Sequence, residues 1–154
     1  MTHTKIYNTP IGKISLTEDG QAITCLDFIT EDIQIDTKIE ETKLLADAYN
    51  QLMDYLNGDR KEFTLPLNPS GTSFQQKVWE VLQSIPYGTT LSYKEVAIKA
   101  GNPKASRAVG MANNRNPIPI IIPCHRVIGA DGKLVGYGGG LPIKVKLLTI
   151  ENCI

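Results

Sequence analysis

The sequence lacks several features that would place it in a familiar structural class. It has three cysteines in 154 residues, and no two of them form a CxxC pair. An odd number without that spacing is neither a disulfide framework nor a recognisable zinc site, so we expect no metal and no other cofactor. The longest apolar run, 118–123, is far shorter than the ~20 residues of a membrane helix. Residues 1–5 are not followed by the apolar core of a secretory signal, and we therefore expect a cytoplasmic protein without a membrane partner.

The three cysteines have different neighbours. Cys25 lies in an apolar stretch typical of a strand, where a buried and passive thiol is expected. Cys153 is next to last and should fray into solvent. Cys124 instead stands beside His125, at the end of the apolar run and ahead of a glycine-rich loop at 136–140. Of the three, Cys124 alone has the surroundings expected of a reactive thiol.

Charge is unevenly divided along the chain, although it sums to zero. Residues 1–73 contain 6 Lys plus Arg against 12 Asp plus Glu, whereas residues 74–154 contain 10 against 4. The two parts therefore carry opposite net charges of about six. The positive part could face a polyanion, but two ordinary solvated lobes would give the same count. Charge alone leaves both interpretations open.

The first part of the chain has the pattern of a small α+β lobe. Apolar and β-branched residues at 13–16 and 22–28 flank a turn at 18–20, which predicts a hairpin. Apolar residues at helical spacing predict a helix over 42–56, and Gly58 follows it as a stop signal. This lobe should therefore contain an antiparallel sheet and one helix.

A connection rich in proline and small polar residues, 66–71, divides the chain. We therefore predict an amino-terminal domain of residues 1–66 and a carboxy-terminal domain of residues 67–154. No internal repeat or low-complexity segment is found.

Helix start signals punctuate the second domain, which we expect to be mainly helical. Two serines are each followed three residues later by Gln or Glu, the pattern of a capping box. The pairs are Ser73 with Gln76 and Ser92 with Glu95. The second of these helices should stop at Gly101, after which Asn102 can cap another helix with Pro103 at its first position. Two short helices joined by a tight turn predict a helix-turn-helix.

The second helix of that motif, predicted over 104–113, is rich in small side chains. Small residues let a helix approach either another helix or a DNA groove closely, and tight helix packing is the more common explanation where charge gives no guide. Two arginines, Arg107 and Arg115, favour DNA. The predicted DNA-binding residues are Ala105, Ser106, Arg107, Ala108, Gly110 and Arg115.

The Cys124-His125 pair predicts thiol chemistry only under a geometric condition. A cysteine in apolar surroundings is a poor nucleophile unless a base takes its proton, and His125 is the available base. Neighbours in an extended chain point in opposite directions, so a turn or a bridging water is needed. Cys-His neighbours also occur by chance, and the pair alone leaves an incidental interpretation open.

A histidine base gains from an acid that fixes its tautomer. Pro142 opens a predicted final helix, and Glu151 shares the inward face of that helix with Leu147 and Leu148. Glu151 could therefore be the acid, whereas a solvated glutamate near a frayed end is the common alternative.

These residues belong to a set of motifs in a fixed order. The carboxy-terminal motifs are Asn116-Pro117, Pro123-Cys124-His125-Arg126-Val127 and Gly136-Tyr137-x-Gly139-Gly140-Leu141. The upstream motifs are Phe74-Gln75-x-x-Val78-Trp79, Ile85-Pro86-Tyr87-Gly88, Ser92-Tyr93 and a stretch from Gly101 to Gly110. Together they resemble the O6-alkylguanine-DNA alkyltransferases over residues 63–151.

The resemblance implies a fold and a reaction. It implies a ribonuclease-H-like amino-terminal lobe and a helical lobe that carries the helix-turn-helix. The implied reaction moves the alkyl group of O6-alkylguanine in double-stranded DNA onto the protein's own cysteine. It is irreversible, happens once per molecule and follows extrusion of the base through the minor groove. The chain is expected to act as a monomer, and activity on O4-alkylthymine is left open.

The resemblance also implies roles for single residues. Cys124 would be the acceptor, His125 the base acting through a water and Glu151 the acid that orients it. Asn116 would brace the turn, and Tyr93 would hydrogen-bond guanine N3. Arg107 would fill the space of the extruded nucleotide. The implied substrate-binding residues are Tyr137, Gly138, Val127 and Trp79.

The chain departs from the family pattern at a few positions. Lys146 stands where many members have an aromatic residue, and Gly138 stands where many have Ser or Ala. His3 and Cys25 form no counterpart to the zinc ligands of some members. Two other functions remain to be separated by experiment: a thiol hydrolase and a non-catalytic DNA-binding protein.

Overall fold

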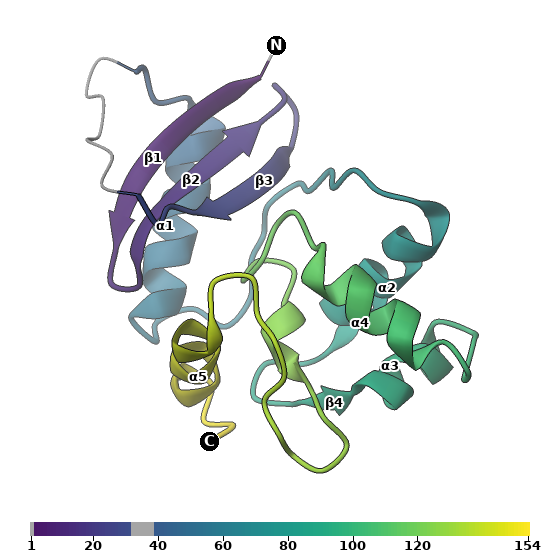
Figure 1. Cartoon of the computed structure of the whole chain (residues 1–154). Helices are drawn as coiled ribbons and strands as arrows, with labels where there is room; N and C mark the ends of the chain where they lie inside the picture. Colours follow the sequence, from purple (N-terminus) through teal and green to yellow (C-terminus); the bar gives the residue numbers. More distant parts are fainter. Residues whose placement is uncertain (1, 32–38) are drawn as a thin grey trace. The chain divides into compact units, whose positions relative to one another are not determined.

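The computed structural model describes residues 2–31 and 39–154, which form two compact units, 1–70 and 71–154 (Figure 1). The units divide four residues after the predicted boundary at 66. The boundary lies later because two backbone hydrogen bonds join this segment to β3 (Ile23–Phe28). The Ile23 N–H donates to Pro66 O at 2.9 Å, and the Asn68 N–H donates to Ile23 O at 2.8 Å. These bonds tie 66–68 to the first unit.

The first unit is a three-stranded antiparallel sheet with one helix packed on it. Strands β1 (His3–Thr9), β2 (Gly12–Glu18) and β3 (Ile23–Phe28) follow one another in the order β1-β2-β3. The predicted hairpin is confirmed as β2 and β3, while β1 was missed by the sequence analysis. Helix α1 (Lys43–Leu56) matches the predicted helix over 42–56 and begins after Thr42, whose hydroxyl accepts the Leu45 N–H.

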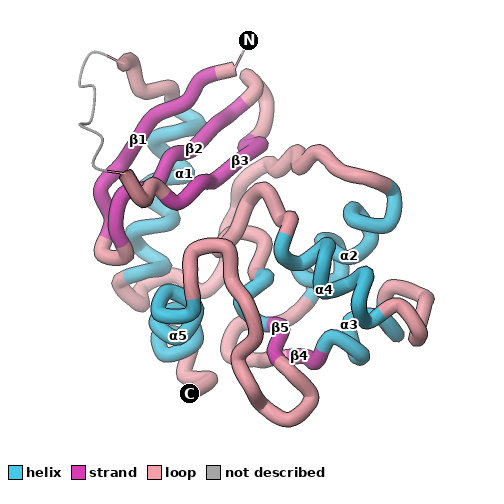
Figure 2. The backbone as a smooth tube through the Cα atoms, in the orientation of Figure 1, coloured by secondary structure: helices cyan, strands magenta, loops and turns pink. Residues whose placement is uncertain are grey.

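The second unit contains four helices and two very short strands in its described residues (Figure 2). Its elements are α2 (Ser73–Ser84), β4 (Leu91–Ser92), α3 (Tyr93–Lys99), α4 (Ser106–Asn114), the 3-10 turn η1 (Cys124–Arg126), β5 (Val127–Ile128) and α5 (Leu141–Ile150). Strands β4 and β5 pair in parallel, and α2, α3 and α4 pack on one another. The predicted α+β class is confirmed.

Capping boxes open two of these helices, α2 and α3. The capping box predicted at Ser92 and Glu95 is present and opens α3. The first box uses Thr72 and Gln75 rather than the predicted residues one position later. Both boxes satisfy amide groups that the first turn leaves without intrahelical partners.

Helix α4 starts later than predicted. Asn102 does not cap it, because the Asn102 Oδ1 accepts the Lys104 N–H within the turn at 3.3 Å. The helix begins at Ser106 without a side-chain cap. Helices α3 and α4 are still the predicted pair joined by a tight turn, with Gly101 at φ 88°.

The passive cysteines also differ from expectation. Cys25 lies on β3 but is half-buried rather than buried, and its Sγ donates to Asp27 Oδ2 at 3.2 Å. Cys153 is half-buried rather than frayed, because its N–H donates to Leu148 O at 2.8 Å. None of the helices in the described residues combines the length and apolar character that crossing a bilayer would need.

Candidate active site and nucleic-acid interface

The chain reaches Cys124 through a strained turn. Ile120 is buried and has a φ of 74°, a left-handed conformation that is unusual for a β-branched residue. The Ile122 N–H donates to Ile118 O at 2.9 Å, which closes the turn. Cys124 then begins the 3-10 turn η1, so Cys124 and His125 do not lie in an extended segment. The turn that the sequence analysis required is therefore present.

Asn116 holds this turn from inside. Its Nδ2 donates to Ile122 O at 2.8 Å, and its Oδ1 accepts the Ile118 N–H at 3.0 Å. Asn113, from α4, adds a bond from its Nδ2 to Cys124 O at 3.3 Å. Two carboxamides thus fix the backbone on either side of Pro123, which places the cysteine at a defined point.

The Cys124 side chain lies in a nearly closed environment. The residue is 4% exposed, and burial raises the pKa of its thiol to about 11. A hydrogen bond from the Asn116 side chain and the positive charge of Lys144 act in the opposite direction and lower that pKa. At neutral pH the resting sulfur is therefore a thiol, and it needs a base to become nucleophilic.

His125 and Glu151 form a buried pair. His125 Nε2 lies 2.7 Å from Glu151 Oε2, and the side chains of both residues are 0% exposed. Because an ionised carboxylate only accepts, Nε2 carries the proton, and the basic lone pair is on Nδ1. Burial lowers the pKa of His125, while Glu151 acts to raise it. The resting imidazole is therefore neutral and able to accept a proton.

Glu151 has further partners besides the histidine. Its Oε1 accepts from Arg126 Nε at 2.8 Å and from the Gly88 N–H at 3.1 Å. Its Oε2 accepts from Arg126 Nη2 at 3.1 Å. Glu151 occupies the C-cap position of α5 and is 2% exposed, so the alternative of a solvated glutamate is wrong.

Lys144 is a second buried cation. It lies on α5 and is 0% exposed, and its Nζ donates to Val127 O at 2.8 Å and to Val135 O at 2.9 Å. Burial lowers its pKa, and the neighbouring Cys124 acts to raise it. Lys144 therefore connects β5 to the residue that precedes the glycine-rich loop, and it places positive charge near the sulfur.

A cavity of about 310 Å³ opens between the two helices of the helix-turn-helix and the glycine-rich loop. Its lining residues are Tyr93, Ser106, Arg107, Gly110, Asn114, Val135 and Gly136. Tyr93 is half-buried, and its hydroxyl donates to Val135 O at 3.5 Å. Burial, together with the nearby Cys124, raises the pKa of the Tyr93 hydroxyl. Tyr93 therefore stays protonated at neutral pH and lies close to both the cavity and the sulfur.

The outer face of α4 is exposed and basic. Arg107, Met111, Asn114 and Arg115 are exposed, and their spacing places them on one face of the helix. Ala108 is also exposed, while Ala105, Ser106 and Gly110 are half-buried. A Cβ added at Gly110 would lie 3.8 Å from the Tyr93 ring, an ordinary contact distance, so the α4 backbone passes close to the tyrosine here. This face combines positive charge with small side chains, and both features favour close contact with a nucleic-acid backbone.

Comparison with known families accounts for both units. Residues 73–153 match the family described as "6-O-methylguanine DNA methyltransferase, DNA binding domain". Residues 2–69 match "6-O-methylguanine DNA methyltransferase, ribonuclease-like domain". The chain belongs to the 6-O-methylguanine DNA methyltransferase family. The predicted family resemblance is confirmed.

Individual relatives are similar over nearly their whole length. The methylated-DNA–protein-cysteine methyltransferase of Methanosarcina acetivorans is 50% identical, over 96% of each chain. The constitutive methylated-DNA–protein-cysteine methyltransferase of Bacillus subtilis is 46% identical, over 99% of this chain and 96% of that protein. A crystal structure of Mycobacterium tuberculosis OGT in complex with DNA is 45% identical and has a TM-score of 0.87. That match covers 97% of this chain and 92% of the other.

The structure separates four residues that the family resemblance grouped as substrate-binding. Trp79 is 1% exposed, and its Nε1 donates to Ala112 O at 2.9 Å, so it supports α4 from the core. Val127 is likewise buried, in β5. Tyr137 is half-buried and Gly138 is exposed, in the same loop as the cavity residues Val135 and Gly136.

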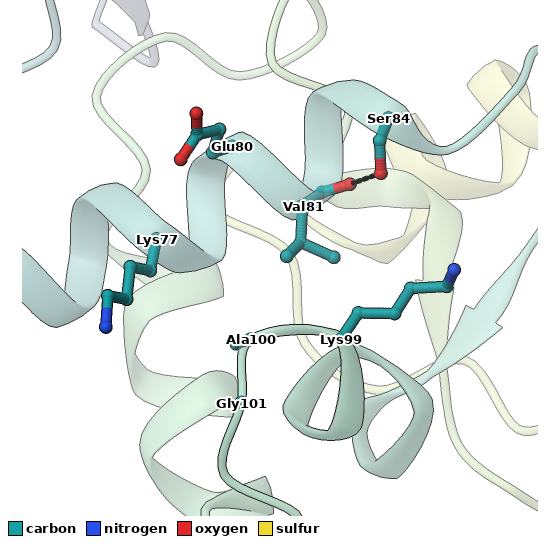
Figure 3. A pocket seen from close by; sticks show the side chains of 7 residues that line it. All are labelled: Lys77, Glu80, Val81, Ser84, Lys99, Ala100 and Gly101. Atoms are coloured by element: carbon teal, nitrogen blue, oxygen red, sulfur yellow. Dashed lines mark hydrogen bonds between the residues drawn. The ribbon is translucent and has the colours of Figure 1, made fainter.

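A second cavity in this methyltransferase-family chain lies away from the predicted site residues. It measures about 560 Å³ and lies between α2 and the end of α3 (Figure 3). Lys77 and Lys99 stand at its edge, and Val81 and Gly101 also line it. None of the predicted catalytic or DNA-binding residues is among its described lining residues.

Sequence reasoning missed two buried cations of the site. In the sequence, Arg126 was considered only as part of a motif. A charged residue directly after Cys-His at the end of an apolar run could have indicated a buried cation. Lys144 precedes Leu147 and Leu148 by three and four residues, which places it on the inward face of α5. The same spacing identified Glu151, and it could have identified Lys144.

Proposed function

We propose that this protein repairs DNA by moving the alkyl group of O6-alkylguanine onto its own Cys124, once per molecule. The proposal rests chiefly on one observation: His125, which directly follows Cys124 in a tight turn, is buried and lies 2.7 Å from Glu151. Its family membership and the DNA complex of its Mycobacterium tuberculosis relative support the same conclusion. Roles for single residues are part of the proposal.

The first step prepares the sulfur. His125 accepts the Cys124 proton on Nδ1, through a bridging water, while Nε2–H stays bonded to Glu151. The thiol and the imidazole are both neutral at rest, so the ion pair forms only when the proton moves. Asn116 and Lys144 stabilise the thiolate, because each lowers the pKa of the thiol.

The second step transfers the alkyl carbon. The thiolate attacks that carbon, the new S–C bond forms as the C–O6 bond breaks, and the electron pair moves onto guanine. The Tyr93 hydroxyl hydrogen-bonds guanine N3 and limits the negative charge that develops there. A thioether gives water no carbonyl to attack, so the thiol is not regenerated. Each molecule therefore reacts once.

Access to the base requires extrusion from the duplex. An O6-alkyl group is buried in stacked DNA, and an alkylated guanine pairs poorly, so it is less costly to extract. We propose that the base enters the cavity lined by Tyr93 and Gly110, while Arg107 fills the space it leaves. The small residues around Arg107 allow α4 to lie in the minor groove.

We propose that one chain is sufficient and that the reaction takes place in the cytoplasm. The proposed chemical and DNA-binding groups all come from residues 71–154 of a single chain, which supports action as a monomer. The reaction also needs a reduced Cys124, a condition that the cytoplasm maintains. In this proposal the predicted domain 67–154 carries both the chemistry and the DNA binding, and none of the assigned groups lies in the predicted domain 1–66.

Intact-mass measurement tests the proposal. The protein is incubated with a duplex oligonucleotide that contains O6-methylguanine, and we expect it to gain the mass of one methyl group. Cys124→Ser should gain nothing, and the matched control Cys25→Ser should behave like the parent. Ester turnover without a mass change would instead favour a thiol hydrolase. Tight DNA binding with neither would favour a non-catalytic binding protein.

A further inference from the structure

Arg126 is the most extensively bonded cation of the site, and the proposed reaction assigns it no step. Its side chain is 9% exposed and extends from η1 into the interior. Nε donates to Glu151 Oε1 at 2.8 Å and Nη2 donates to Oε2 at 3.1 Å, while Nη1 donates to Ile85 O at 2.7 Å. The Tyr87 ring lies beneath the guanidinium, with its centroid 5.7 Å from Cζ. This two-point grip is the geometry in which arginine orients a carboxylate most firmly.

The Glu151 carboxylate accepts hydrogen bonds from both Arg126 and His125. Arg126 occupies one side of it, and His125 Nε2 bonds Oε2 from another. Because Oε1 also accepts the Gly88 N–H, the carboxylate cannot rotate without losing several bonds at once. The position of the oxygen that faces His125 is therefore fixed by Arg126 and Gly88.

Arg126 also balances charge. The negative charge of Glu151 and the positive charge of Arg126 cancel where they meet, and Lys144 adds a positive charge near the sulfur. The ring therefore lies beside a compensated carboxylate rather than a bare one in the low-dielectric interior.

Without Arg126, the full charge of Glu151 would act on the ring beside it. A nearby carboxylate favours the imidazolium, and a ring that is already protonated cannot serve as a base. Besides Glu151, the charged groups that act on the pKa of the ring are Arg126 and, on α5, Lys144, and both lower it. The further titratable groups that interact with the carboxylate are Tyr87 before β4 and Cys153 after α5. Of these groups, Arg126 alone bonds the same carboxylate as His125 in the described contacts.

We infer that Arg126 is a positioning residue that orients Glu151 and offsets its charge, so that His125 rests neutral and ready to take the Cys124 proton. The inference rests on the proposed alkyl transfer and deepens it. Arg126 touches neither the alkyl group nor the sulfur in this scheme, and it acts through Glu151 on His125.

The pH dependence of methyl transfer tests this role. Single-turnover rates are measured for the parent, Arg126→Gln and Arg126→Lys with a duplex containing O6-methylguanine, from acid to neutral pH. In Arg126→Gln the loss of a positive charge raises the pKa of His125, so the ring stays protonated to higher pH. We expect the acid side of its profile to move up by about one pH unit, a roughly tenfold loss of rate at acid pH.

Arg126→Lys is the matched control, since it keeps the charge and loses the two-point grip. We expect a lower rate at every pH, with the acid side of the profile where the parent has it. A purely structural role would lower both variants equally at all pH values, and that result would overturn the inference. If the glutamine variant does not fold, the neutral variant Arg126→Met takes its place, and an acid side of its profile that stays where the parent has it contradicts charge compensation. Failure of the parent to gain a methyl group would instead overturn the proposed function.

Discussion

The chain has two histidines, one in each unit, and each contacts a buried glutamate. His3 Nδ1 lies 2.9 Å from Glu18 in the first unit, and His125 Nε2 lies 2.7 Å from Glu151 in the second. The His3 side chain is 42% exposed, whereas the His125 side chain is fully buried. Similar pairings thus occur in very different surroundings.

The partners of the two glutamates explain the difference. Glu18 also accepts from the Gly20 N–H and the Thr42 hydroxyl, both neutral donors. Glu151 shares its charge with the buried guanidinium of Arg126 and follows the helix that carries Lys144. The first pair is a hydrogen-bonded strand contact, and the second is part of a charged cluster beside a cysteine. Surroundings, rather than the pairing itself, distinguish a structural histidine from a candidate base.

The two cysteines with the most strongly raised thiol pKa follow the same rule. Burial raises the pKa of Cys25 to about 12, and the carboxylate of Asp27 adds to the increase. Burial also raises the pKa of Cys124, to about 11, but Asn116 and Lys144 act to lower it. A thiolate at Cys25 would be repelled by Asp27, whereas a thiolate at Cys124 would be stabilised by Asn116 and Lys144.

Replacing each histidine by alanine should produce the largest difference between the units. We expect His125→Ala to slow alkyl transfer by about 100- to 10,000-fold, the usual contribution of a positioned general base, with little loss of DNA affinity. His3→Ala should transfer at the parental rate. Single-turnover kinetics and DNA-binding titrations measure the two quantities. Equal rates for parent and His125→Ala near neutral pH would rule out the base.

Neutralising each buried glutamate should separate the units in stability. Glu151→Gln leaves the Arg126 guanidinium buried without a negative partner, and we expect it to lower the free energy of unfolding by about 3 kcal/mol. Glu18→Gln loses bonds to neutral or half-exposed donors, and we expect about 1 kcal/mol. Urea unfolding of both variants provides the comparison. A larger loss for the first-unit variant would contradict the assigned surroundings.

Removing one arginine from each unit should have a smaller effect that depends on the substrate. Arg107 lines the cavity, so Arg107→Ala should slow repair of duplex O6-methylguanine by about tenfold, the value of one modest contact. Its reaction with the free alkylguanine base should change little. The control Arg60→Ala removes an arginine that bonds Glu62 O and should alter neither reaction. An equal loss on duplex and free base would refute the role assigned to Arg107.

The parts of the fold that depend on nearby residues were predictable from the sequence. The Thr42 start of α1 and the Ser92–Glu95 box of α3 involve bonds across three residues, and they appeared where the sequence indicated. The start of α4 was wrong, because the Asn102 side chain bonds within its own turn instead of capping the helix. Local signals compete with one another, and the sequence does not show which one wins.

The parts that depend on distant residues were only partly predictable. Helical spacing identified Glu151, and motif order identified Cys124 and His125. The bond from Arg126 Nη1 to Ile85 O spans 41 positions, and no local pattern signals it. The positive φ of Ile120 could not be expected either, since β-branched residues disfavour that conformation. Tertiary bonds around the turn impose it.

Mapping the methyl group tests the central claim most directly. The protein is treated with excess duplex DNA containing O6-methylguanine and digested with a protease. The masses of its cysteine-containing peptides are then measured. We predict one methyl group per molecule, on the Cys124 peptide, with none on the peptides of Cys25 or Cys153 even after long incubation. A methyl group on either of those two cysteines, or an unmodified Cys124 while the damaged base is consumed, would contradict the account.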